Sequence, residues 1–226
     1  MEIGKSVGES FEYAKEGLVG KWAKWILLII SCIIFPLVLG YMMRIYRGVK
    51  PSPELNEWGG MFIDGIKLLI VGIIYAIPIL IVEFAVIGSA GIAFLVALSN
   101  PMADPNALTG LIGAVLFGVV ILVLVAIIIE MIAIIGMVRF ARTNSFGQAF
   151  NFGAIFATIG RIGIGTYILA LIVMAIIVGI IEVICWLIPY VGFVLLIIIL
   201  PFLVLFSTRY ITLLYESAGE EASPPA

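Results

Sequence analysis

Long runs of apolar residues, separated by short polar segments, dominate the pattern of this sequence. Five such runs cover residues 25–43, 68–99, 109–138, 162–188 and 191–214. A helix needs about 20 apolar residues to cross the hydrocarbon core of a bilayer, which is about 30 Å thick. The pattern therefore predicts an all-α polytopic membrane protein with about five apolar segments. Four of them are spans, the last two forming a hairpin at residues 189–192, and the first is bent or re-entrant.

Two of the runs are longer than a bilayer requires. As single helices, residues 68–99 and 109–138 would be about 45 to 48 Å long at about 1.5 Å per residue. Paired glycines are poor residues for a helix interior, so Gly88-Ser89-Ala90-Gly91 predicts a break that leaves residues 91–99 as a short separate element. The Asn-Pro and Asp-Pro-Asn steps within residues 100–106 then predict a turn.

The distribution of lysine and arginine predicts an orientation. Four precede the first run, four separate it from the second, three lie between the third and fourth runs, and the segments 99–110 and 189–192 have none. Because basic loops remain in the cytoplasm, residues 44–67 and 139–161 are expected inside a plasma membrane that the chain crosses several times. Arg209 is assigned to the tail, so no lysine or arginine is expected within a hydrocarbon span.

The first run does not obey this rule as a simple crossing, because both of its flanks are basic. Pro36 lies near its middle and indicates a bend. Residues 25–43 would then form a re-entrant or interfacial hairpin that returns to the cytoplasmic side. The alternative is a kinked span with the N-terminus outside, in which acidic residues between positions 2 and 16 balance the lysines.

Three segments have the helical spacing of apolar residues that is typical of amphipathic helices at a membrane surface. In residues 3–22 the apolar positions recur at steps of three or four: Ile3, Val7, Phe11, Ala14, Leu18 and Trp22. A second helix is predicted to begin at Ser52-Pro53-Glu54, a typical start signal, and to extend through Phe62. The third segment covers residues 146–159. All three are expected to be cytoplasmic.

The second and third of these segments can be aligned. Residues 58–62 (WGGMF) followed by Lys67 match residues 152–156 (FGAIF) followed by Arg161, and each segment precedes a pair of apolar runs. This similarity indicates an internal repeat. We predict a single membrane domain over residues 1–219, with possible repeat units 3–50, 52–140 and 146–214 and a flexible tail at 220–226.

Residues 57–67 (EWGGMFIDGIK), which lead to Pro78, and residues 146–167 are similar to those of a family of archaeal and some bacterial multi-pass membrane proteins. That family is catalogued only as a domain of unknown function. The similarity covers nearly the whole chain except residues 220–226. The resemblance implies a helical membrane protein of archaeal origin, and it brings no assigned activity or site residues.

Composition agrees with a protein that dissolves in lipid. Only 12% of the residues are charged and 64% are hydrophobic, whereas an average soluble domain has about 25% and about 45–50%. The formal charge of −2 gives no attraction to a polyanion, so no nucleic-acid partner is expected.

The sequence contains no recognisable catalytic constellation. It has no histidine, which removes the commonest general base and transition-metal ligand, and Cys32 and Cys185 lie far apart within apolar runs. We therefore expect no catalytic residues, no metal, no cofactor and no enzymatic activity.

Glu83, Glu130 and Glu182 interrupt the apolar runs and are the best candidates for an intramembrane pathway. An ionisable side chain in lipid is costly and marks a functional position by default. The alternative is structural: Glu182 would face the outer headgroups, while the other two glutamates would hydrogen-bond to neighbouring helices.

The basic residues near the cytoplasmic surface are candidates for binding lipid headgroups, with an attraction of about 1 kcal/mol per charge. They are Lys21, Lys24, Arg44, Arg47, Arg139, Arg142 and Arg161. Topology alone would also place them there. Small residues four positions apart, such as Gly110, Ala114 and Gly118, allow helices to approach closely. They indicate either ordinary packing or a homo-oligomer.

Two functions agree with these features. The leading hypothesis is a small transport or channel-like protein for ions, protons or a small solute. The alternative is a non-catalytic protein that binds lipid or organises membrane assembly. Membrane lipids and further copies of the chain are the expected partners, and the sequence identifies no partner protein.

Overall fold

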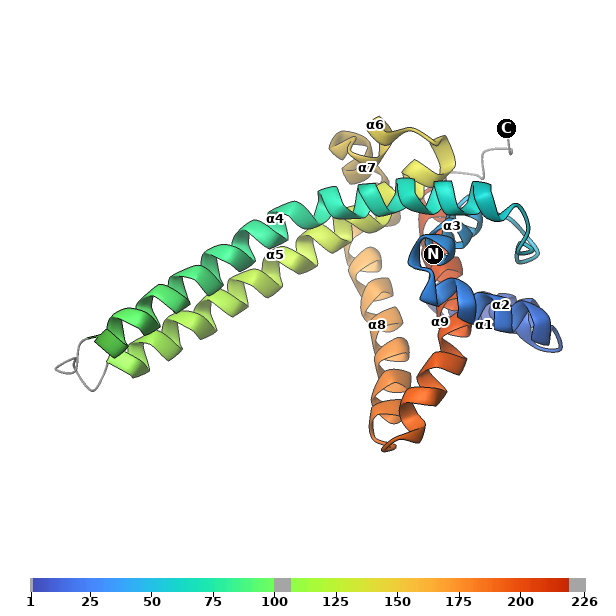
Figure 1. Cartoon of the computed structure of the whole chain (residues 1–226). Helices are drawn as coiled ribbons and strands as arrows, with labels where there is room; N and C mark the ends of the chain where they lie inside the picture. Colours follow the sequence, from blue (N-terminus) through green and yellow to red (C-terminus); the bar gives the residue numbers. More distant parts are fainter. Residues whose placement is uncertain (1, 100–106, 220–226) are drawn as a thin grey trace. The chain divides into compact units, whose positions relative to one another are not determined.

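A computed structural model describes residues 2–99 and 107–219, which form helices without any strand (Figure 1). The helices are α1 (Ile3–Leu18), α2 (Trp22–Ile33), α3 (Phe35–Tyr46), α4 (Trp58–Ser99), α5 (Ala107–Thr143), α6 (Phe146–Ala149), α7 (Phe152–Ile162), α8 (Ile164–Trp186) and α9 (Val191–Glu216). Within the described ranges, four helices are long and apolar enough to cross a membrane, or five spans if α2 and α3 are counted as one. The predicted all-α membrane class is confirmed.

The chain divides into two compact units. Unit 1 comprises Met1–Val71 and Ile134–Ala226, and unit 2 comprises Gly72–Ala133. Unit 2 is a hairpin of α4 and α5, whose helices lie side by side (Figure 1). At Gly118 of α5 an added Cβ would lie 2.7 Å from a methyl group of Val86 on α4, so the absence of a side chain permits this close approach. The predicted flexible tail and the predicted turn at 100–106 lie outside the described residues.

The predicted break at Gly88-Ser89-Ala90-Gly91 is wrong, because α4 is helical throughout Trp58–Ser99. The two glycines cost the helix about 1 kcal/mol each relative to alanine. An interrupted helix in lipid would expose backbone groups, each of which costs several kcal/mol without a partner. The larger penalty therefore decides in favour of a continuous helix.

The helix predicted to begin at Ser52 is also wrong, since α4 begins only at Trp58. Side chains of α3 hydrogen-bond the carbonyl groups that precede α4: the Tyr41 hydroxyl donates to the Pro53 carbonyl at 2.9 Å, and Arg44 donates to the Glu54 carbonyl at 3.1 Å. These tertiary contacts hold residues 51–57 outside any helix. They override the local start signal.

The bend predicted in the first apolar run is confirmed. Helices α2 and α3 are bent by 120° at Ile34. Pro36 lies in the first turn of α3, where its missing N–H group costs nothing and its ring favours the start of a new helix. A change of direction beyond a right angle fits the re-entrant alternative better than a kinked span, although the side of the membrane stays a prediction.

Unit 1 is built around α9, which packs against α1, α3 and α8. The predicted helix of residues 3–22 exists but ends at Leu18, followed by Gly20 at φ 80°. Ala14 and Leu18 are buried as expected, whereas Phe11 is exposed on one side and meets Phe202 at a ring distance of 5.4 Å. The remaining buried positions of α1 are small or polar and include Ser6, Ser10 and Gly17.

The predicted helix at residues 146–159 is two helices, α6 and α7, because the chain is interrupted at Phe150 and Asn151. The Asn151 side chain accepts a hydrogen bond from the Ala154 N–H at 3.1 Å and so caps α7. The hairpin predicted at residues 189–192 is confirmed between α8 and α9. There Gly192 is required, since an added Cβ would lie 1.7 Å from the Cys185 carbonyl oxygen.

Candidate functional site

Two of the three candidate glutamates lie in unit 2, and the third belongs to unit 1. Glu83 on α4 is half-buried, whereas Glu130 on α5 and Glu182 on α8 are exposed. The Val86–Gly118 contact sets the register of the hairpin in unit 2. In that register Glu83 and Glu130 lie about 14 Å apart along the helix axes, at about 1.5 Å per residue. Glu182 belongs to unit 1.

Most of the basic residues that were predicted to bind headgroups contact other parts of the chain. Arg44 donates to the Asn56 side chain at 2.7 Å, and Arg47 pairs with Asp64 at 2.7 Å. Arg139 donates to Gln148 at 2.7 Å, and Arg161 donates to Thr158 at 3.4 Å. These contacts occupy part of the hydrogen-bonding capacity that a headgroup would need. The role of these four arginines in lipid binding stays a prediction.

Arg142 belongs to a buried charge cluster with Glu216 and Arg209. Its guanidinium, 4% exposed, pairs with Glu216 at 2.7 Å and lies over the Tyr215 ring at 5.6 Å. The other carboxylate oxygen of Glu216 lies 3.8 Å from Arg209, which is 1% exposed. Three guanidinium nitrogens of this pair of arginines form no hydrogen bond with the described residues. Its buried members carry two positive charges against one negative charge, and the exposed Glu9 also acts electrostatically on Arg209.

Arg209 also connects α1 to α9. Its guanidinium lies 5.4 Å from the ring centroid of Tyr13, within the range of a cation–π contact. Burial raises the pKa of the Tyr13 hydroxyl, and the nearby Arg209 opposes this shift. Tyr13 therefore remains neutral and donates a hydrogen bond to the Val49 carbonyl at 3.1 Å.

The sequence-based assignment of Arg209 to the tail is wrong, because Arg209 lies within α9. A signal was present in the sequence, since this arginine falls inside the apolar run of residues 191–214. An arginine in such a run indicates a buried charge with a partner. Glu216, seven residues later, lies two helical turns away on the same face and is that partner.

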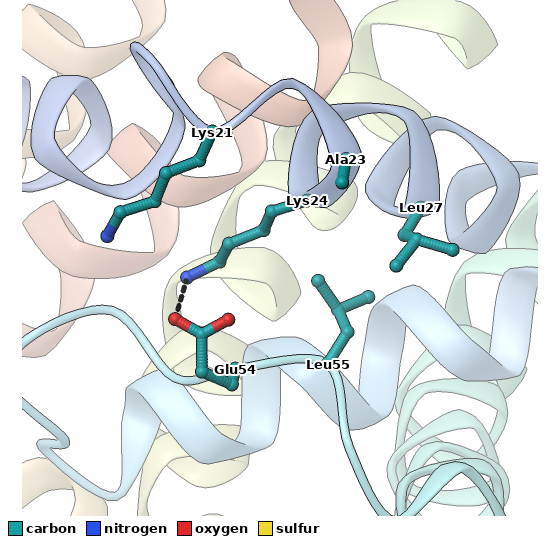
Figure 2. Close-up of a pocket in the computed structure, with 6 residues that line it drawn as sticks. All are labelled: Lys21, Ala23, Lys24, Leu27, Glu54 and Leu55. Carbon is teal, nitrogen blue, oxygen red and sulfur yellow. Dashed lines mark ion pairs between the residues drawn. The ribbon is translucent and has the colours of Figure 1, made fainter.

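A second charged site is a pocket of about 280 Å³ beside the start of α2 (Figure 2). It is lined by Lys21, Ala23, Lys24, Leu27, Glu54 and Leu55. Lys21 directly precedes α2, and the next three residues lie within α2. Glu54 and Leu55 come from the non-helical segment that precedes α4. The fold thus brings together residues that are about thirty positions apart.

Lys24 is the rigid member of this pocket. It is 5% exposed, and its ammonium donates to the carbonyl and the hydroxyl of Ser52 at 3.1 and 2.9 Å. The same ammonium pairs with Glu54 at 3.6 Å, which Figure 2 marks. Ser52 can approach because α1 has a glycine at position 17, where an added Cβ would lie 2.7 Å from the Ser52 hydroxyl oxygen.

Lys21 is the adaptable member. Its side chain is exposed and extends beside Lys24, as Figure 2 shows. Within the described part of the chain, the Lys21 ammonium forms no hydrogen bond or ion pair. With two ammonium groups and one carboxylate, the pocket has a net charge of about +1, which suits a monoanion.

The pocket adjoins side chains that are typical of a membrane interface. Trp22 is 71% exposed and stacks on Trp25 at a ring distance of 5.8 Å. The Trp25 indole N–H donates to the Ile198 carbonyl of α9 at 2.7 Å. Tryptophan is enriched where hydrocarbon meets headgroups, because its ring is apolar and its N–H needs a polar partner.

The apolar helices and their interfacial charges define an integral membrane protein of the all-α class. The chain belongs to the family described as "Protein of unknown function (DUF4013)", whose model matches residues 25–190. No curated protein and no solved structure matches the chain.

Proposed function

We propose that this chain is a non-catalytic lipid-binding protein that binds the phosphate of a phospholipid headgroup at Lys21, beside the buried charge of Lys24. The observation that carries the proposal is the pocket beside α2, where these ammonium groups lie next to the apolar side chains of Leu27 and Leu55. A phospholipid has the same combination, since its phosphate is anionic and its glycerol and acyl chains begin a few ångströms away. The lysine pattern and the positive-inside rule favour the cytoplasmic leaflet.

Lys21 is the residue at which this proposal is best tested. Lys24 supports the fold through Ser52, so its removal would disturb the pocket itself. We expect Lys21→Gln to weaken the binding of dioleoyl-phosphatidylglycerol about fivefold, since one near-surface charge contributes about 1 kcal/mol. Native mass spectrometry of the delipidated protein, titrated with this lipid in detergent, measures the change.

The matched control is Lys15→Gln. Lys15 is an exposed lysine of α1 that pairs with Glu12 at 3.2 Å and does not line the pocket. The Lys15→Gln substitution removes the same charge from the protein and should change the affinity for the lipid by less than about twofold. Equal losses for Lys15→Gln and Lys21→Gln would mean that general charge, and not the pocket, attracts the lipid.

Transport is the second candidate, supported by Glu83 and Glu130. Neither carboxylate has a hydrogen bond or ion pair with the described residues, although both lie on apolar helices, where a lone charge is costly. Because Glu130 faces outward from its own hairpin, a pathway would need a second copy of the chain to enclose it.

The double variant Glu83→Gln/Glu130→Gln tests this candidate. If these carboxylates carry protons or cations, flux through wild-type protein in proteoliposomes should exceed that of empty vesicles and fall at least tenfold in the variant. Glu12→Gln, which replaces an exposed glutamate of α1 that pairs with Lys15, is the control and should keep most of the flux. Absence of wild-type flux would remove the transport candidate and leave lipid binding unaffected.

A further inference from the structure

The pocket beside α2 contains a carboxylate as well as two ammonium groups, and a site for a simple anion would not need that carboxylate. Glu54 lines the pocket and pairs with Lys24 at 3.6 Å, yet its side chain is 67% exposed. The Lys24 ammonium also donates hydrogen bonds to two oxygen atoms of Ser52, so it does not depend on Glu54 alone. The Glu54 carboxylate therefore has lone pairs available to a donor that enters the pocket from outside.

We infer that the pocket selects a phosphate diester that carries a primary ammonium, as in the headgroup of phosphatidylethanolamine. This inference rests on the proposed lipid-binding function and adds Glu54 as the residue that determines headgroup specificity. The phosphate binds the free ammonium of Lys21. It lies beside the buried charge of Lys24, whose three N–H groups are taken up by Ser52 and Glu54. The ammonium of the same headgroup donates to Glu54.

The arrangement of charges matches that headgroup. Phosphate and ammonium are joined by two carbon atoms, so the two charges of the headgroup lie within a few ångströms of each other. The opposite charges of Lys24 and Glu54 are also close, with nitrogen and oxygen 3.6 Å apart. A phosphatidylcholine headgroup has the same two charges, but its quaternary ammonium has no N–H group to donate to a carboxylate. A phosphatidylglycerol headgroup has the phosphate and no ammonium, so it leaves Glu54 without a partner.

Hydrogen-bond donation thus distinguishes phosphatidylethanolamine from phosphatidylcholine. The carboxylate is largely exposed, so the preference is expected to be that of a solvent-accessible ion pair, about two- to fivefold. Lys21 contributes to the binding of both lipids, because both carry the phosphate. Glu54 contributes only to the difference between them.

The experiment is a competition measured by native mass spectrometry. Delipidated full-length protein in detergent receives equimolar dioleoyl-phosphatidylethanolamine and dioleoyl-phosphatidylcholine, and the ratio of the two bound lipids is recorded. Wild type should bind the first lipid about threefold more than the second. Glu54→Gln should reduce the ratio to about one, with total bound lipid maintained.

Glu57→Gln is the matched control. Glu57 lies three residues after Glu54, pairs with Arg44 at 3.5 Å, is 82% exposed and does not line the pocket. Its replacement should leave the ratio unchanged. A ratio of one in wild type, or an unchanged ratio in Glu54→Gln, would overturn the inference. The unfolding temperature of each variant identifies any loss that comes from a disturbed fold.

Two further arms separate the possible failures. If Lys21→Gln leaves total bound lipid unchanged, the proposed function itself fails. If Lys21→Gln lowers the total while Glu54→Gln leaves the ratio intact, only the headgroup inference fails. Displacement of the bound lipid by equimolar glycerophosphoethanolamine would assign the pocket to a soluble ligand of the same chemistry and overturn the lipid assignment.

Discussion

Replacing Gly65 with alanine should destabilise the protein by about 3 kcal/mol, toward the upper end of the cost of overpacking a core. An added Cβ at this position would lie 1.6 Å from the Pro36 carbonyl oxygen and 2.9 Å from the Gly40 nitrogen. Both atoms belong to the backbone of α3, so no side chain can rotate away. The crossing of α3 and α4 would have to open.

The same crossing depends on Gly40, whose added Cβ would lie 1.8 Å from the Met61 carbonyl oxygen. Gly40 on α3 faces the backbone of Met61, and Gly65 on α4 faces the backbone of Pro36. Small residues at such a crossing let helix backbones touch. Met61 is fully buried in the core that α1, α3 and α9 share. Opening the crossing would therefore expose part of this core.

Thermal unfolding in detergent measures the effect, and Gly60→Ala is the matched control. Gly60 lies in the first turn of the same helix, with no atom within 4 Å of an added Cβ. Alanine there should be neutral or stabilising by up to about 1 kcal/mol. We expect Gly65→Ala to lower the unfolding temperature by roughly 6 to 12 °C. A change under about 2 °C would show that the two helices do not touch through their backbones.

Glu216→Gln should be the second most damaging substitution, with a loss of about 3 kcal/mol. Glu216 is the carboxylate between Arg142 and Arg209, at 2.7 and 3.8 Å. The side chains of Arg142 and Arg209 are only 4% and 1% exposed. Without the carboxylate, the two buried guanidinium groups would lose the negative charge that lies between them. Breaking a buried ion pair by removing one member typically costs about 3 to 5 kcal/mol.

Arg209→Met separates charge balance from simple loss of contact. This substitution removes the arginine that has two guanidinium nitrogens without a hydrogen bond to the described residues. It leaves the Arg142–Glu216 ion pair at 2.7 Å intact. We expect a loss below about 1.5 kcal/mol, since an apolar side chain of similar volume can replace a buried charge at little cost. Glu12→Gln, which removes an exposed partner of Lys15, should cost less than about 0.5 kcal/mol. If Glu216→Gln were no more damaging than Glu12→Gln, the buried cluster would not be a structural element of α9.

The sequence predicted the features that depend on local chemistry. Apolar run length indicated the spans, helical spacing indicated α1, and Pro36 indicated the bend between α2 and α3. The predictions were wrong where the environment of a segment, such as lipid or a neighbouring helix, outweighs its local preference. Gly88 and Gly91 did not break α4, because an interrupted backbone costs more in lipid than two glycines cost in a helix.

The candidate site was predicted only in part, for a similar reason. Lys21 and Lys24 were identified from their charge near an apolar run. The sequence around Glu54 predicts a helix start, since nothing local indicates that Tyr41 and Arg44 hydrogen-bond the carbonyls of this segment. The sequence does not predict the backbone contact of Gly40 and Gly65 either. It joins α3 to α4 through positions that look like ordinary glycines in a chain with 24 of them.

The most direct test of phosphate binding at the pocket is a distance measurement between lysine nitrogen and lipid phosphorus. Protein labelled with ¹⁵N at the lysine side chains and reconstituted in phosphatidylethanolamine vesicles would be examined by solid-state ¹⁵N–³¹P dipolar recoupling. We predict strong dephasing from a bound phosphate, which Lys21→Gln reduces and Lys15→Gln leaves intact. Dephasing that Lys21→Gln does not change would contradict phosphate binding by Lys21.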